Sequence, residues 1–161
     1  MSPIELPAGL DDLRVEPLMA MTLTVAVPTL VGIGPGGDRR VGVVTGGRFS
    51  GKRLAGRVLE GGSDWQLLRS DGAWTIDCRL VLQTDDGAMI GMRYTGLRHG
   101  PGDVLRRLAD GEAVEPQDYY FRITPTFETA DPRYDWLNRI IAVGAGHRPP
   151  SGPVYKVWAV A

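Results

Sequence analysis

Apolar residues occur along this chain in short runs that alternate with polar residues and end at glycine, proline or Asp-Gly pairs. Alternation with a period of two is typical of β-strands, and an Asp-Gly pair between two such runs indicates a hairpin turn. Residues 103–110 instead show helical spacing between Asp103, which can cap a helix, and Gly111, which can end it. The pattern predicts strands at residues 18–31, 40–44, 54–59, 65–69, 74–84, 88–97, 119–128, 139–144 and 154–160.

The number of turn residues favours an all-β fold. The 161 residues include 22 glycines and 12 prolines, which separate the apolar runs and form no low-complexity tract. About nine or ten short strands with one short helix indicate a single antiparallel β-barrel or a sandwich. We favour the barrel, because some strand faces carry charge where a sandwich core requires apolar side chains. One domain is expected over residues 1–161, with residues 1–13 as a loose lead-in.

Two predicted strands separate apolar and charged side chains onto opposite faces. One strand carries Asp77 and Arg79 on one face and only apolar side chains on the other. The strand at residues 119–128 does the same with Arg122 and Glu128. The apolar faces must be buried, but the charged faces admit two interpretations. They form either a solvated outer surface with weak cross-strand ion pairs or the wall of a polar barrel lumen.

Composition and charge narrow the function classes. The formal net charge of −1 indicates no basic surface for nucleic acid. No apolar run approaches the roughly 20 residues of a membrane-spanning helix, so no membrane association is predicted. The N-terminus lacks the basic start and apolar core of a signal peptide, so a cytoplasmic protein is expected. The single cysteine and the two histidines have no metal-ligand spacing, and neither a metal nor a cofactor is predicted.

Two glycine-rich segments match nucleotide-binding motifs in part. Residues 32–37 fit the spacing G-x-G-x-x-G, and residues 46–52 fit most of a P-loop. Both motifs must open a helix whose N-terminus holds the phosphates. The residues that follow each segment are not helical in pattern, so we expect hairpin turns at both places.

Several short motifs follow one another in a distinctive order. They are Gly46-Gly47 with Gly51, Gly61-Gly62-Ser63-Asp64-Trp65, Asp77-x-Arg79, Thr84-Asp85-Asp86-Gly87-Ala88-x-Ile90, Tyr120-Phe121-Arg122, Phe127-Glu128-Thr129 and Tyr134-x-Trp136-Leu137-Asn138. This series, over roughly residues 14–160, resembles the DUF3237 family, also called UPF0311. The resemblance implies a small β-barrel of lipocalin-like or allene-oxide-cyclase-like shape, in which residues 99–116 form a variable insertion at the mouth. The family name states that no function is assigned, so the resemblance implies no reaction.

The motif positions define a candidate small-molecule site in the lumen. We interpret Asp64 and Glu128 as the acid or base, and Arg79 and Arg122 as the groups that hold developing negative charge. The candidate substrate-binding residues are Trp65, Asp77, Tyr94, Trp136 and Asn138.

Three hypotheses for function remain open at this point. The first is a cofactor-independent enzyme of isomerase, cyclase or lyase type that moves protons on a small aromatic or polyketide-like metabolite. The alternative is a non-catalytic small-molecule binding protein of lipocalin-like type. The third is an interaction protein, since open strand edges favour a homodimer. The residues alone do not separate these hypotheses.

Overall fold

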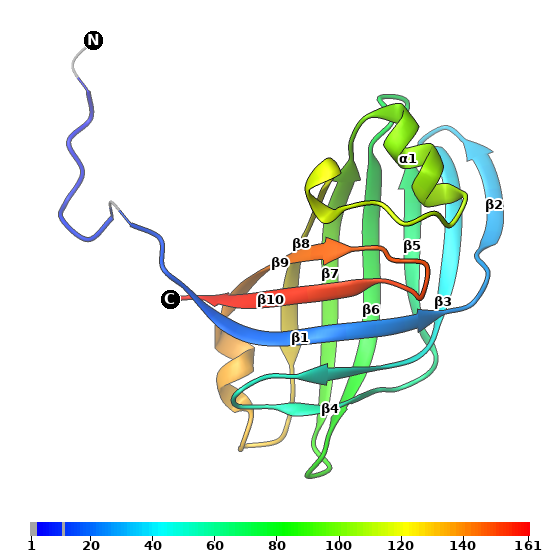
Figure 1. The fold of residues 1–161 in the computed structure, drawn as a ribbon. Helices are drawn as coiled ribbons and strands as arrows, with labels where there is room; N and C mark the ends of the chain where they lie inside the picture. Colours follow the sequence, from blue (N-terminus) through cyan, green and yellow to red (C-terminus); the bar gives the residue numbers. More distant parts are fainter. Residues whose placement is uncertain (1–2, 11) are drawn as a thin grey trace.

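The computed structural model describes residues 3–10 and 12–161, and the ten strands in these ranges belong to one antiparallel sheet (Figure 1). The strands are β1 (Val15–Val25), β2 (Thr29–Gly34), β3 (Gly37–Ser50), β4 (Ala55–Val58), β5 (Gly62–Leu68), β6 (Trp74–Thr84), β7 (Met89–His99), β8 (Tyr120–Glu128), β9 (Ile141–His147) and β10 (Val154–Val160). One α-helix, α1 (Gly102–Ala109), and two 3₁₀ turns, Pro116–Asp118 and Asp135–Arg139, complete the fold.

The sheet closes on itself through β3. Eight strands form the barrel in the order β1, β10, β9, β8, β7, β6, β5 and β3, and β3 pairs back with β1. The first half of β3 pairs with β5, and its second half pairs with β1 and the short β4. The outer strands β2 and β4 extend this barrel. The predicted all-β antiparallel barrel with one short helix is confirmed.

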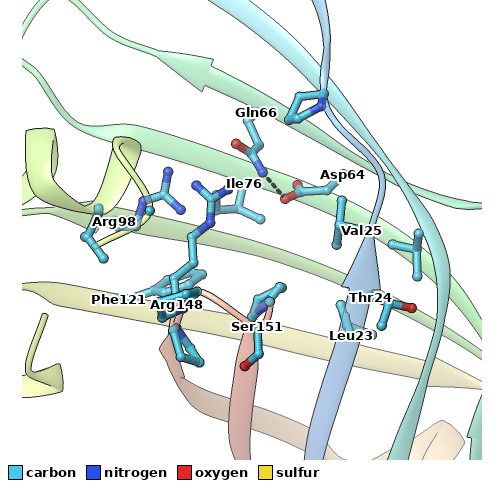
Figure 2. Close-up of a pocket in the computed structure, with 18 of the residues that line it drawn as sticks. Leu23, Thr24, Val25, Asp64, Gln66, Ile76, Arg98, Phe121, Arg148 and Ser151 are labelled. Atoms are coloured by element: carbon cyan, nitrogen blue, oxygen red, sulfur yellow. Dashed lines mark hydrogen bonds between the residues drawn. The ribbon is translucent and has the colours of Figure 1, made fainter. Parts of the chain in front are cut away.

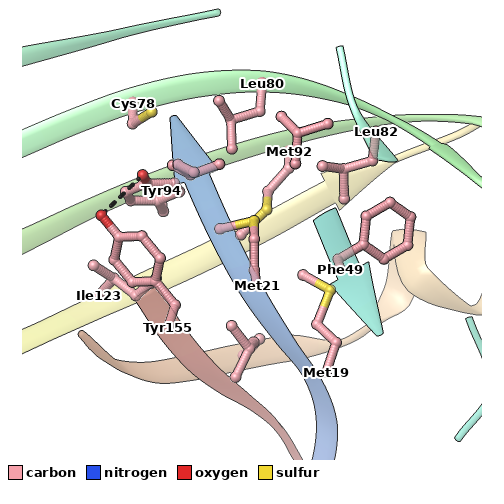
Figure 3. Close-up of a cluster of buried hydrophobic side chains, with 14 of the residues drawn as sticks. Met19, Met21, Phe49, Cys78, Leu80, Leu82, Met92, Tyr94, Ile123 and Tyr155 are labelled. Atoms are coloured by element: carbon pink, nitrogen blue, oxygen red, sulfur yellow. Dashed lines mark hydrogen bonds between the residues drawn. The ribbon is translucent and has the colours of Figure 1, made fainter. Parts of the chain in front are cut away.

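Alternation along the strands fills one half of the barrel with hydrocarbon. On β6 the side chains of Cys78, Leu80 and Leu82 point inward, and their neighbours point outward. Met21 from β1 and Met92 from β7 meet them in the interior, each no more than 2% exposed (Figure 3). The interior at this end is packed, so a lumen can exist only toward the other end of the strands.

The helix α1 lies across that other end of the barrel (Figure 1). Its buried side chains, Val104 and Leu108, belong to the apolar core, and the rest of the helix is mostly exposed. The helix begins and ends one residue before the range predicted from the sequence. Within the described ranges, no helix is long and apolar enough to cross a membrane.

The strand predicted at residues 18–31 is in fact two strands. Pro28 lies in the break between β1 and β2, because proline has no N–H to donate to a sheet ladder. The segment after the break pairs with β3 over residues that we had predicted as a turn. Of the predicted lead-in at residues 1–13, residues 1, 2 and 11 lie outside the described ones, and the others are exposed.

The strand β2 lies at a free edge of the sheet. Within the described part of the chain it pairs with β3 alone, and both of its faces are exposed to solvent. Its apolar side chains Leu30, Val31 and Ile33 are 64–90% exposed. Open edges of this kind can pair with another chain. The homodimer expected from the sequence stays a prediction.

Candidate functional site

A cavity of about 380 Å³ lies in the half of the barrel beneath α1 (Figure 2). It is lined by side chains of β1, β3, β5, β6, β7, β8 and β10, by the end of α1, and by the loop at residues 148–153. Its apolar wall includes Leu23, Val25, Val44, Ile76 and Phe121. Its polar wall includes Asp64, Gln66, Tyr94, Arg98, Arg148 and Tyr155.

Cross-strand register aligns the deepest polar side chains of this cavity. Asp64 on β5 is paired with Cys78 on β6, and Cys78 is paired with Tyr94 on β7, so all three point inward at one level. The Tyr94 hydroxyl donates a hydrogen bond of 3.3 Å to the Tyr155 hydroxyl of β10. Burial raises the pKa of both tyrosines, and both remain neutral phenols at neutral pH.

Asp64 is a buried carboxyl group with one free oxygen. The residue is 8% exposed, and Gln66 Nε2 donates a 2.7 Å hydrogen bond to its Oδ2. Its Oδ1 is buried and has no hydrogen-bond partner among the described residues. Burial raises the pKa of Asp64, against the weaker opposing effects of the Gln66 hydrogen bond and of Arg98 and Arg148. A carboxyl group with a raised pKa can exchange a proton nearer neutral pH than an exposed one.

The raised pKa predicts how Asp64→Asn changes stability with pH. Below the unfolded-state pKa of Asp64, the carboxyl is neutral in both the folded and the unfolded protein. Its burial then costs no free energy of ionisation. As pH rises past that value, the unfolded state loses the proton first, so the stability of the wild type falls until pH passes the folded-state pKa. Asparagine cannot ionise. We therefore expect the melting temperature of Asp64→Asn, minus that of the wild type, to increase between about pH 4 and pH 7.5.

Thermal unfolding of both proteins across this pH range measures the difference directly. Each kcal/mol gained in the free energy of unfolding raises the melting temperature by about 2–4 °C for a domain of this size. The other titrating groups are common to both proteins and largely cancel. A difference that stays constant or decreases with pH would show that the pKa of Asp64 is not raised in the folded state.

Arg98 is a buried cation at the same cavity. Its position on β7 is paired with Trp74 on β6 and Phe121 on β8. The guanidinium carbon lies 5.4 Å from the Trp74 ring centroid and 5.6 Å from that of Phe121, so two aromatic faces flank the charge. Burial, followed by repulsion from Arg148, lowers the pKa of Arg98 to about 10. The group is therefore still a cation at neutral pH.

The second arginine of the cavity, Arg148, lies in the loop at residues 148–153, whose two ends are held by hydrogen bonds. The backbone N–H of Arg148 donates a 2.8 Å hydrogen bond to the Tyr119 hydroxyl, which lies 3.0 Å from Nδ1 of His147. At the far end of the loop, the N–H of Leu23 donates to the carbonyl of Pro153 at 2.9 Å. The loop also contains three prolines at positions 149, 150 and 153, which restrict its backbone. The backbone that carries Arg148 is therefore restrained.

The carboxylate at the mouth is already neutralised. Glu112, just after α1, lines the cavity and accepts a 3.0 Å hydrogen bond from Nε of Arg107. Leu108 and Ala109 contribute apolar atoms beside it. The end of α1 therefore adds little net charge to the entrance.

Two of the residues predicted from the sequence line this cavity. Asp64 and Tyr94 point into it, as described above. Four other candidates do not, and their predicted orientation is wrong. Asp77 and Arg79 on β6, and Arg122 and Glu128 on β8, point out of the barrel. The apolar side chains of both strands fill the interior, and alternation sends the charged neighbours to the outer surface.

The outer position of these charges fits the solvated-surface interpretation. Asp77 pairs with Arg93 on the neighbouring strand at 3.4 Å, and the two side chains are 46% and 52% exposed. An ion pair this exposed contributes little to stability. Trp65 shares this outer face and is 50% exposed. Its predicted contact with a substrate in the lumen is therefore corrected as well.

Trp136 and Asn138 also lie away from the cavity. They belong to the 3₁₀ turn Asp135–Arg139, where the Trp136 ring stacks 3.6 Å from the guanidinium carbon of Arg53. Asn138 Oδ1 accepts a 2.8 Å hydrogen bond from the backbone N–H of Thr129. This turn supports the end of β8, so both residues have structural contacts in place of the predicted substrate contacts.

Sequence reasoning missed four polar residues of the cavity: Gln66, Arg98, Arg148 and Tyr155. A period of two from Met92 through Tyr94 reaches Arg98, but the strand was predicted to end at Leu97. Tyr155 could have been placed inside by the same rule, because Lys156 beside it must face water. No local signal marks Arg148, which lies in a loop.

Cys78 is a packed thiol on the inward, apolar face of β6. The residue is fully buried, and burial raises the pKa of its thiol to about 12. A thiol with so high a pKa is not a nucleophile at neutral pH.

A family model described as a protein of unknown function, DUF3237, matches residues 13–160. The chain belongs to the DUF3237 family. The resemblance inferred from the motifs is thus confirmed. A UPF0311 protein of Clostridium acetobutylicum is 34% identical over 153 residues, which cover 94% of this chain and 97% of the relative. A UPF0311 protein of Rhodopseudomonas palustris is 37% identical over 124 residues, 77% of this chain and 81% of that protein.

Solved structures show the same fold as this DUF3237 chain. A β-barrel-like protein from Acinetobacter baumannii has a TM-score of 0.82 and 41% identity, over 93% of this chain and 97% of that one. A conserved protein of unknown function from Rhodopseudomonas palustris has a TM-score of 0.90 and 33% identity, with 93% and 99% covered. A third structure, described as an enzyme from Penicillium herquei, has a TM-score of 0.72 and 20% identity over the whole of both chains. At that identity the likeness shows a common fold.

Proposed function

We propose that this DUF3237 protein is a cofactor-independent enzyme that transfers protons on a small aromatic or polyketide-like molecule bound in the barrel cavity. Reactions of isomerase, cyclase and lyase type share this step. The observation that carries the proposal is Asp64, a buried carboxyl with a raised pKa and a free oxygen, in a cavity that also holds two arginines. The related fold of a protein described as an enzyme supports it at the level of the scaffold.

The groups around the cavity divide the work as follows. Asp64 in its ionised form takes a proton from a carbon next to a carbonyl group, while Gln66 holds Oδ2 in place. The electrons of the broken C–H bond form a C=C bond, and the carbonyl oxygen becomes an enolate oxygen. Arg98 or Arg148 stabilises that negative charge. Where a further C=C bond is conjugated with this enolate, return of the proton from Asp64 to the far carbon of that bond completes an isomerisation.

The apolar wall provides the binding energy for a ring or an acyl chain. Leu23, Val25 and Ile76 line one side of the cavity, and Phe121 lies beside Arg98. A pocket with mostly apolar walls and a few convergent polar groups is the usual form of a small-molecule site.

Hydrogen exchange in D₂O tests the proposal before the natural substrate is known. The probes are phenylpyruvate, 2-hydroxyacetophenone and benzoylacetone, which all carry an aromatic ring and an exchangeable C–H next to a carbonyl. Proton NMR measures the loss of that C–H signal with and without the protein. We expect the wild type to accelerate exchange of at least one probe and Asp64→Asn not to. Acceleration of none, or acceleration that survives in Asp64→Asn, would contradict the proposal.

A binding protein without catalysis is the second candidate. Arg98 and Arg148 line the cavity. They can hold a ligand there whether or not the ligand reacts, and this favours a binding role. A probe that binds to the wild type, is recovered unchanged and exchanges no hydrogen would support this function.

A further inference from the structure

The cavity contains more positive than negative charge. Arg98 is 5% exposed and still a cation, and Arg148 faces the same space (Figure 2). Within the part of the chain that the structure describes, neither guanidinium forms an ion pair with a carboxylate. A buried cation without a partner is costly, so proteins seldom keep one unless a ligand neutralises it.

The carboxylates at the cavity do not supply the missing charge. Glu112 is paired with Arg107 at the mouth. Asp64 is hydrogen-bonded to Gln66 and forms no ion pair with either guanidinium group. Both cations thus remain available to something that enters the barrel.

The Arg98 side chain and the backbone of Arg148 are held in place before any ligand arrives. Arg98 is fixed between the rings of Trp74 and Phe121, which leave its N–H groups directed into the cavity. Arg148 projects from the loop that Tyr119 holds through the backbone N–H. Figure 2 shows the two side chains and the Gln66–Asp64 pair pointing into one space. Guanidinium groups bind planar oxyanions by paired N–H donors.

We propose that the ligand of this cavity is an organic anion whose planar oxyanion is held by Arg98 and Arg148. Its apolar body lies against Ile76, Val25 and Leu23, which places its middle within reach of Asp64. Carboxylates and enolates share this chemistry. The inference concerns the same cavity as the proposed enzyme, and it names the class of molecule that the enzyme or binding protein takes.

Isothermal titration of the wild type with phenylacetate and with phenylacetamide tests this inference. The two probes have nearly the same shape and differ in charge. We expect phenylacetate to bind at least about tenfold more tightly than phenylacetamide, because only the anion offsets the buried cations. Arg98→Met and Arg148→Met should each remove most of this preference, since methionine keeps an apolar chain of similar length. Arg79→Met, on the outer face, is the matched control and should keep it.

Three results would overturn the inference. The first is phenylacetamide binding as tightly as phenylacetate, and the second is phenylacetate giving no signal at about 10 mM. The third is a preference for the anion that survives in both cavity variants. If Arg98→Met does not fold, Arg148→Met, in a surface loop, still decides the question.

The same titrations separate this inference from the proposed function. Asp64→Asn should bind phenylacetate at least as tightly as the wild type, because asparagine cannot ionise and so cannot repel an anion. Anion preference without hydrogen exchange on any probe keeps the anion site and contradicts the enzyme. Exchange that depends on Asp64, without anion preference, keeps the enzyme and contradicts the anion site.

Discussion

Replacing Asp64 with asparagine is expected to slow proton transfer by about 10²–10⁴-fold and to leave the barrel folded. Asparagine has nearly the same shape and can still accept the hydrogen bond from Gln66 through its side-chain oxygen. It cannot take up or release a proton as the wild-type carboxyl does. The rate of hydrogen exchange on the responsive probe, measured by NMR at saturating probe, gives the effect directly.

Asp77→Asn is the matched control for this variant. Asp77 lies on the neighbouring strand β6, but its side chain points out of the barrel and is 46% exposed. We expect it to keep the wild-type rate within about twofold, because an exposed ion pair with Arg93 is worth little. Equal losses in the two variants would show that the effect comes from the strand surface or the fold and not from a group in the cavity.

Leu82→Ala is expected to destabilise the protein by about 2–5 kcal/mol. Leu82 is fully buried in the packed half of the barrel, among Met19, Met21 and Phe49 (Figure 3). Removing its branched end leaves a void that the surrounding strands cannot close, because each is held by hydrogen bonds on both sides. Urea unfolding followed by tryptophan fluorescence measures the change in the free energy of unfolding.

Val81→Ala is the control for whether a β6 side chain points into or out of the barrel. Val81 is the next residue on β6, points outward and is 44% exposed. We expect a change within about 0.5 kcal/mol, the usual range for a surface position. Similar losses at positions 81 and 82 would contradict the inward and outward assignment of β6, on which the positions of Asp77, Cys78 and Arg79 also depend.

The strands and turns of this barrel could be predicted because their signals are local. The Asp-Gly turns form where the sequence indicated, and Gly72 and Gly87 adopt φ angles of 82° and 91°, which glycine accepts without strain. The long alternation in β6 and β8 also identified which faces had to be buried. These features depend on a few neighbouring residues, so the sequence shows them directly.

The site was harder to predict because it depends on the closure of the sheet. The alternation of β5 is short, and the strand begins at Gly62, before the predicted start at residue 65. Asp64 therefore points inward through its pairing with β3 and β6, which are distant in sequence. Arg148 reaches the cavity only because the β9–β10 loop folds over the barrel end. Neither position follows from local residue order.

The charged positions of β6 and β8 illustrate the same limit. Both interpretations of Asp77, Arg79, Arg122 and Glu128 agreed with the alternation pattern, because a barrel has a polar outside and can have a polar inside. The choice depended on which side the apolar neighbours filled. Here those neighbours, among them Leu80 and Phe127, occupy the interior.

The most direct test of the account is the pKa of Asp64 in the folded protein. Carbon-13 NMR of the side-chain carboxyl, assigned with the Asp64→Asn variant, follows its titration from acid to neutral pH. The account predicts a midpoint above the ordinary range for aspartate, since burial outweighs the nearby arginines. A midpoint at or below the ordinary range would mean that Asp64 is a well-solvated or ion-paired carboxylate, and would remove the acid on which the proposed proton transfer depends.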